Sequence, residues 1–204
     1  GTMTLQNLTV DNNTLTVNNP KAADFAVNLS DVIGTSSFSD NNITLSGVIG
    51  GGGTFFHGVN VGGASTGTWT MNNNQLDGNN VGANSCGYRL RNTLPATCIL
   101  NITGGIIAEF ANGIRADDLT AGVDVNVHNA VIKNNTAYGI LNGTGAGAMI
   151  DAVQNYWGTL HGPQDNTGTL EVPRAPKPSV ADMKNAVPAP NLGNAVSDRV
   201  DYFP

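Results

Sequence analysis

The sequence has little charge, few aromatic residues and no long apolar run. Only 12% of its 204 residues are charged, and aromatic side chains make up 6%. The net charge of -6 and the pI near 4.7 argue against a surface that binds a nucleic-acid duplex, which needs clustered Lys and Arg. No stretch approaches the roughly 18 consecutive apolar residues of a membrane-spanning helix. We therefore expect neither a nucleic-acid partner nor a membrane span.

Asparagine, glycine and threonine dominate the composition instead, with 28, 26 and 20 copies. Glu, Lys and Gln, which favour helices, are scarce. Asn and Gly favour turns, whereas Thr, Val and Ile favour strands. The periodic Val, Ile and Leu argue against disorder, and the length suffices for one domain with a sizeable core. The composition therefore predicts an all-β protein.

A repeat of about 25 residues runs through the second half of the chain. The matched pairs are Ile102 and Val127, Ile106 and Val131, Gly113 and Gly139, and Ile114 and Ile140. A β-type unit this short cannot bury its own apolar side, so it must stack on its neighbours. The repeat predicts a parallel β-helix of six or seven rungs, each with three short strands, stacked about 4.8 Å apart.

We expect one domain with three parts. Residues 1–42 hold N-terminal strands or a cap, residues 43–158 hold the rungs, and residues 159–204 form a Pro-rich tail with a closing strand. Residues 1–20 alternate polar and apolar positions as strands do, while residues 21–40 indicate a short helical turn or a capping segment. Proline removes a backbone donor and is excluded from central strands, so the tail lies outside the rungs.

Two cysteines, Cys86 and Cys98, lie 12 residues apart. We expect a disulfide that closes a loop projecting from one corner of the coil, which would contribute about 3 kcal/mol by loop closure. Two free buried thiols are the alternative. The sequence has no signal peptide, as expected of a secreted protein after cleavage. Several Asn-x-Ser/Thr sequons leave glycosylation open in a chain this rich in Asn.

The end of the chain carries a recognisable pattern. DAVQNYWGTLHGP (151–163) is followed, after a variable segment, by GNAVSDRVDYFP (193–204). This pattern resembles the terminal rung of extracellular bacterial and archaeal repeat proteins with the right-handed parallel β-helix of the pectin-lyase-like class. Those proteins commonly carry Trp where this chain has Tyr156. The resemblance covers roughly residues 43–204 and implies a fold and an extracellular setting, but not one activity.

Arg115, Asp117 and Asp118 form the only cluster of opposite charges, with Glu109 just before them. In polysaccharide lyases of the resembled fold, an arginine can abstract a proton while carboxylates hold calcium. Such a calcium site needs several carboxylates that converge on one ion. The alternative is a solvated turn with a surface ion pair worth about 0–1 kcal/mol. We expect no metal and no other cofactor, with calcium as the minority alternative.

Aromatic and histidine side chains are the remaining candidates. Trp69 and Tyr88 could form an exposed platform that stacks on sugar rings, or they could lie inside the coil. His57, His128 and His161 each stand alone, which indicates surface or turn histidines rather than metal ligands.

The sequence thus predicts a non-catalytic, extracellular structural or adhesive module. We expect it to associate with itself through its sheet edges, with residues 1–20 as a donated strand. The alternatives are a polysaccharide-binding module and a calcium-dependent lyase of acidic polysaccharide, in which Arg115 is the base and Asp117 and Asp118 bind calcium.

Overall fold

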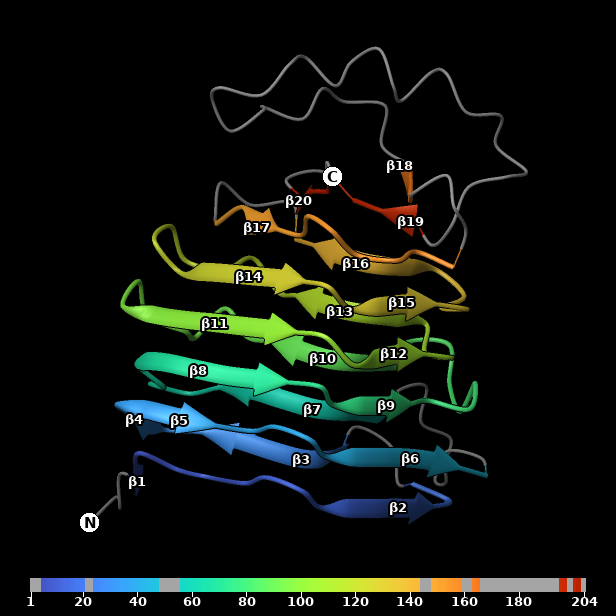
Figure 1. Ribbon diagram of the computed structural model, residues 1–204, viewed down its shortest axis with the longest axis horizontal. Helices are drawn as coiled ribbons and strands as arrows, with labels where there is room; N and C mark the ends of the chain where they lie inside the picture. Colours follow the sequence, from blue (N-terminus) through green and yellow to red (C-terminus); the bar gives the residue numbers. More distant parts are fainter. Residues whose placement is uncertain are drawn as a thin grey trace.

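The computed structural model describes residues 5–20, 24–47, 56–143, 148–158, 163–165, 195–197 and 200–202. Among these residues every regular element is a β-strand, and all strand pairs are parallel. The strands stack as a β-solenoid of about five turns (Figure 1). The prediction of an all-β parallel coil is confirmed, and the predicted six or seven rungs are too many.

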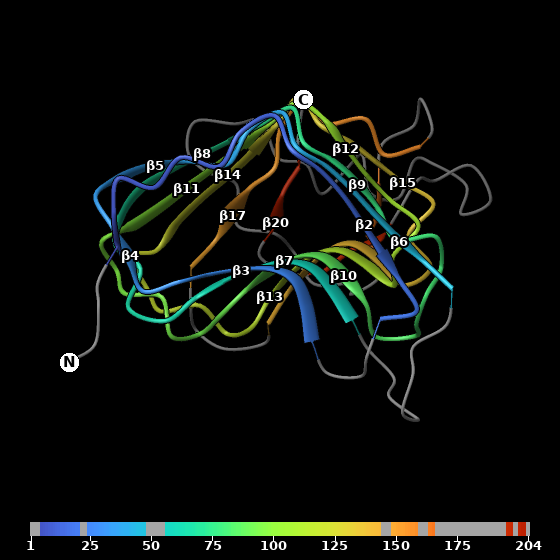
Figure 2. The same ribbon diagram turned by 90° about the horizontal axis from the view of Figure 1, so that it is seen from below.

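Three sheets run along the coil, and Figure 2 shows them as the sides of its cross-section. The seven-stranded sheet contains β3 (Asp24–Ser30), β7 (Phe56–Gly62), β10 (Cys86–Leu90), β13 (Asn112–Ala116), β16 (Tyr138–Asn142), β19 (Ala195–Val196) and β18 (Gln164–Asp165). The six-stranded sheet contains β5 (Thr35–Ser37), β8 (Gly67–Asn72), β11 (Cys98–Thr103), β14 (Asp124–His128), β17 (Ile150–Asp151) and β20 (Val200–Asp201).

The third sheet has five strands: β2 (Thr14–Asn18), β6 (Asn42–Ser46), β9 (Gln75–Asp77), β12 (Ile106–Ala108) and β15 (Val131–Lys133). A short pair, β1 (Leu5–Gln6) and β4 (Val32–Ile33), lies at the N-terminal end. The predicted register is confirmed, because Ile102 pairs with Val127, Ile106 with Val131, and Ile114 with Ile140.

One apolar core fills the coil along its axis. Its largest side chains, including Trp69, Phe38 and Phe110, are less than 2% exposed. Strand alternation explains this core, since the inner positions of β11 and β14 carry Leu100, Ile102, Val125 and Val127 while the residues between them face solvent. Burying each large aliphatic side chain contributes about 1.5–3 kcal/mol.

Asparagine and glycine shape the turns between sheets. Asn73, Gly104 and Asn129 follow three paired strand positions, and all three have positive φ angles of 54°, 67° and 56°. These residue types adopt the left-handed conformation at low cost. Buried Asn41 and Asn74 form a ladder between coils, because the Asn74 side-chain oxygen accepts a hydrogen bond from the Asn41 backbone N–H at 3.0 Å. The abundance of Asn thus reflects repeated turns.

Glycines also form a ladder in the seven-stranded sheet, where Gly58, Gly87 and Gly113 lie one coil apart. A Cβ atom on Gly87 would lie 2.7 Å from the Gly113 carbonyl oxygen and 2.7 Å from Ile107 Cγ2. A Cβ atom on Gly58 would lie 2.8 Å from the Gly87 carbonyl oxygen. Close packing of backbone against core therefore requires glycine at these positions.

The structure differs from the sequence-based layout near the N-terminus. Residues 24–37 form β3, β4 and β5 rather than a helical turn or cap. β2 pairs in register with β6, so the coil begins before residue 43. At the other end, β19 and β20 add to the stacked sheets, as the predicted closing strand requires. The Pro-rich segment 166–194 lies outside the described residues.

Candidate functional site

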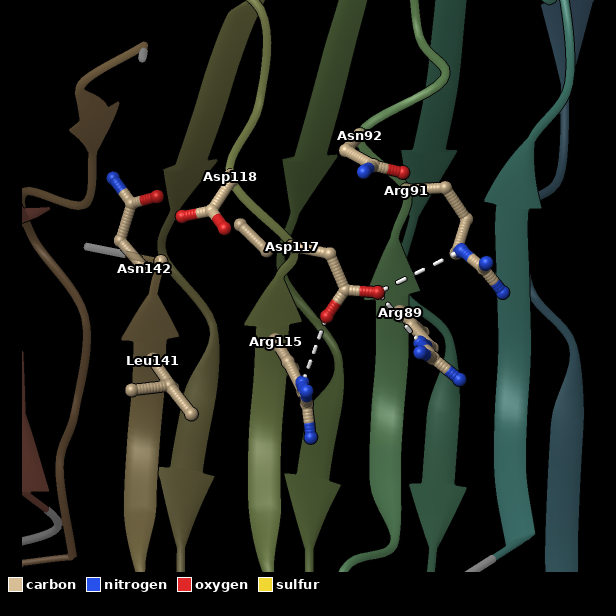
Figure 3. Close-up of a pocket in the computed structure, with 10 residues that line it drawn as sticks. Arg89, Arg91, Asn92, Arg115, Asp117, Asp118, Leu141 and Asn142 are labelled. Atoms are coloured by element: carbon tan, nitrogen blue, oxygen red, sulfur yellow. Dashed lines mark hydrogen bonds and ion pairs between the residues drawn. The ribbon is translucent and has the colours of Figure 1, made fainter. Parts of the chain in front are cut away.

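The predicted charged cluster gains two further arginines in the structure. Arg115 on β13 and Arg89 on β10 occupy opposite positions in the register of these two neighbouring strands. Arg91 and Asp117 follow the ends of these two strands. Because parallel strands end at the same edge of a sheet, stacking brings these four side chains together across two coils (Figure 3).

Asp117 lies at the centre of this cluster. Its Oδ2 atom is 2.9 Å from Arg89 Nε and 3.6 Å from Arg91 Nε, and its Oδ1 atom is 2.8 Å from Arg115 Nε. The Asp117 and Arg89 side chains are only 16% and 17% exposed. One carboxylate therefore serves as counter-ion for three guanidinium groups.

This cluster concentrates positive charge in an acidic chain. The described residues contain four Lys and Arg side chains, and Lys133 alone lies outside the cluster. Like charges at paired positions of neighbouring strands repel each other, so Arg89 and Arg115 destabilise the sheet unless an anion offsets them. The cluster borders a hollow of about 480 Å³, with Asp118, Leu141 and Asn142 on its opposite side (Figure 3).

Buried His57 lies beneath the arginines on the neighbouring coil. Its Nε2 atom is 3.1 Å from Arg89 Nη1, and its Nδ1 atom is 2.9 Å from Cys86 Sγ. Burial first, and the Arg89 charge second, lower the pKa of His57 to about 3. Burial also raises the pKa of the Cys86 thiol. Both groups are neutral near pH 7, so this thiol lacks the thiolate character of a nucleophile.

The disulfide prediction is wrong, because Cys86 and Cys98 are both free and buried. Cys86 begins β10 in the seven-stranded sheet, whereas Cys98 begins β11 in the six-stranded sheet. The segment between them is not a projecting loop, since β10 belongs to the coil. Burial raises the pKa of Cys98 to about 11, which keeps this thiol protonated too.

The sugar-platform prediction is also wrong. Trp69 and Tyr88 are 0% and 1% exposed, so neither ring face can stack on a ligand. The alternative, aromatic rings inside the coil, is confirmed. The Tyr88 hydroxyl accepts a hydrogen bond from the Asn74 side-chain amide at 3.0 Å, which satisfies this buried polar group.

The structure does not bring Asp117 and Asp118 to one position. Asp117 points at the arginines, while Asp118 lies on the side of Asn142 (Figure 3). Within the described part of the chain, no group of three or more His, Cys, Asp and Glu side chains could hold a metal. The His128 Nε2 atom lies 3.2 Å from the Asp151 Oδ1 atom. His161 lies outside the described residues.

Sequence reasoning found Arg115 and Asp117 but missed Arg89 and Arg91. It also predicted a surface or turn histidine at His57, which is wrong, because His57 is buried in β7. A signal was present, because Gly87-Tyr88-Arg89 and Gly113-Ile114-Arg115 share one pattern and occupy paired positions. Aligning that pattern would have placed the two arginines on adjacent strands.

Comparison of the chain with family models, curated proteins and solved structures gave no match. None of the described residues forms a helix that is long and apolar enough to cross a membrane. The structure itself shows a parallel β-solenoid with a cluster of three arginines and one aspartate on its outer face.

Proposed function

We propose that the protein is a non-catalytic, extracellular structural module of the pectin-lyase-like class, which associates with a second copy through its N-terminal sheet edges. The observation that carries this proposal is the edge itself. β2 and β3 each end their sheet at the N-terminal end of the coil, with a described partner on one side alone (Figure 1), whereas residues 8–12 bond to the outer side of β5. Unpaired strand edges are templates for association.

The edge strand β2 offers free backbone groups to a partner. The Asn13 carbonyl accepts from the Asn42 N–H at 2.7 Å, and the Asn19 N–H donates to the Ser46 carbonyl at 2.8 Å. These residues therefore direct their backbone groups at β6. Because backbone direction alternates along a strand, the N–H groups of Thr14, Thr16 and Asn18 point to the open side.

Apolar side chains at the same end support the proposal. Leu8, Val10, Leu15 and Val17 pack against the core but are only partly buried. A strand from a second copy would cover these side chains while pairing the free N–H groups of β2. Since residues 5–6 and 14–18 already pair with β4 and β6, this segment is the receiving edge rather than a detached donor arm.

Light scattering coupled to size exclusion tests self-association, together with negative-stain electron microscopy. We expect a mass of at least twice 21.0 kDa for the wild type. Thr16→Pro removes an outward N–H without touching the pairing to β6, and it should give a monomer. Thr16→Ser keeps that N–H and should assemble like the wild type. A wild type that stays monomeric at high protein concentration would rule the proposal out.

A further inference from the structure

We propose that the hollow beside Arg89, Arg91 and Arg115 binds a doubly charged tetrahedral oxyanion, a phosphate or a sulfate group. This site lies on the outer face of β10 and β13, away from the N-terminal edge, and it does not depend on self-association. Three steps support it: the orientation of the guanidinium groups, their charge, and the number of donors.

The first step is orientation. Asp117 contacts the Nε atom of each arginine. No hydrogen bond or ion pair among the described residues reaches the terminal nitrogens of Arg91 or Arg115. Figure 3 shows both guanidinium ends directed away from Asp117. Hydrogen bonds to Asp117 hold Arg89 and Arg115, and Arg91 lies at ion-pair distance, while the terminal N–H groups of Arg91 and Arg115 stay available to a ligand.

The second step is charge. Three arginines and one aspartate leave two positive charges without a counter-ion in the cluster. Asp118 lies across the hollow, where its Oδ1 atom lies against Gly143. Asp118 lowers the net charge of the whole lining to one positive charge, which a phosphate with -1.5 to -2 charges near pH 7, or a sulfate, would offset. Sequences break local rules mainly at functional sites, and the paired Arg89 and Arg115 break the rule against aligned like charges.

The third step is the number of donors. A carboxylate offers two oxygens, which one arginine fork satisfies. The guanidinium groups of Arg91 and Arg115 come from neighbouring coils. A ligand that binds both therefore needs oxygens in several directions. A tetrahedral group with three or four oxygens meets this requirement. The chemistry fits a free inorganic anion and an ester on a polymer equally well.

Isothermal titration calorimetry at low ionic strength tests the site with sodium sulfate, sodium phosphate and dextran sulfate, and unsubstituted dextran serves as the neutral comparison. We expect wild-type binding that weakens as salt is added. Arg91→Gln and Arg115→Gln should each weaken binding at least tenfold. Lys133→Gln makes the same charge change outside the cluster and should stay within twofold of the wild type.

The outcomes separate the two sources of the anion. Dextran sulfate that binds at least tenfold tighter per sulfate than sodium sulfate indicates a polymer-borne group, while equal affinity indicates a free anion. Circular dichroism melting checks that each variant is folded, and Arg91→Lys or Arg115→Lys replaces the Gln variant of the same residue if that variant is not. Absence of wild-type binding to all three anions overturns the proposal, as does an equal loss of affinity in Lys133→Gln.

Discussion

The two large sheets of the coil carry different outer surfaces, although the same turns of chain build both. On the six-stranded sheet, Asn101 and Asn126 occupy paired outward positions, and the Asn126 amide donates to the Asn101 side-chain oxygen at 3.1 Å. On the seven-stranded sheet, the corresponding outward pair is Arg89 and Arg115, which share Asp117 as counter-ion.

The amide row and the arginine row differ in whether stacking of the coils satisfies their side chains. An amide row satisfies itself, because each side chain both donates and accepts and none is charged. An arginine row repels itself and relies on a carboxylate from outside the strand. The solenoid depends on its inner residues and its turn residues, so the outer arginines are an addition that the fold must accommodate. Four measurements test this contrast.

Gly87→Ala should have the largest effect, because it breaks the packing beneath the charged surface. The new Cβ atom would meet the Gly113 carbonyl oxygen and Ile107 Cγ2 at 2.7 Å each. Overpacking of this kind costs 1–3 kcal/mol, and two close contacts favour the upper end, about 3 kcal/mol. Urea unfolding followed by circular dichroism measures the change. A loss below about 1 kcal/mol would mean that the sheet can shift to accept a side chain.

Asp117→Asn should lower the free energy of unfolding by about 2 kcal/mol, since it leaves three partly buried arginines without their carboxylate. The value lies below that for a fully buried pair, because Arg91 and Arg115 are 35% exposed. Asp124→Asn makes the same change at an exposed position of β14 and should cost under about 0.5 kcal/mol. Equal losses in the two variants would contradict the role of Asp117.

The pH dependence of stability should reveal His57. The unfolded chain binds a proton at His57 near pH 6.5, whereas the folded protein does so only near pH 3. The contribution of neutral His57 to the free energy of unfolding is therefore complete above pH 6.5, and it declines as the pH falls toward 3. Between pH 6.5 and 5.0 the wild type should lose about 1.6 kcal/mol through this group. Urea unfolding at both pH values should show a smaller loss in His57→Gln, and an unchanged loss would place the titration elsewhere.

Asn126→Ser should have the smallest effect, below about 0.5 kcal/mol, since it removes one partly exposed amide hydrogen bond from the neutral surface. Thermal melting of Asn126→Ser, Gly87→Ala and Asp117→Asn under the same conditions allows the stabilities of the three variants to be compared. If Asn126→Ser cost as much as Asp117→Asn, the two outer surfaces would not differ in the way described.

The sequence predicted the fold best where coils have equal length. Asn101 and Asn126 lie 25 residues apart, and so do Ala130 and Asn155, so a fixed period finds these coils. Asn28 and Asn60 are 32 residues apart, and His57 and Cys86 are 29 apart. Longer turns shift the period there, which explains why β3 was not predicted as a strand. β10 keeps a spacing of 26 residues to β13 and could have been found by that period.

The candidate site was harder to predict than the fold. Arg115 and Asp117 are close in sequence and stand out as a local charge cluster. Arg89 lies 28 residues before Asp117, and only the stacking register brings the two together. Likewise, whether Trp69 or Tyr88 points inward depends on which parity of each strand faces the core.

The uniform parallel stacking also determines how the protein would respond to a pulling force. Each coil contacts mainly the coils before and after it, and no described strand pair bridges distant coils of the rod. Force applied between the ends would therefore detach one coil at a time. A detached coil of about 25 residues releases chain on the order of 90 Å when extended. The molecule would thus dissipate mechanical work in repeated steps rather than fail in one event.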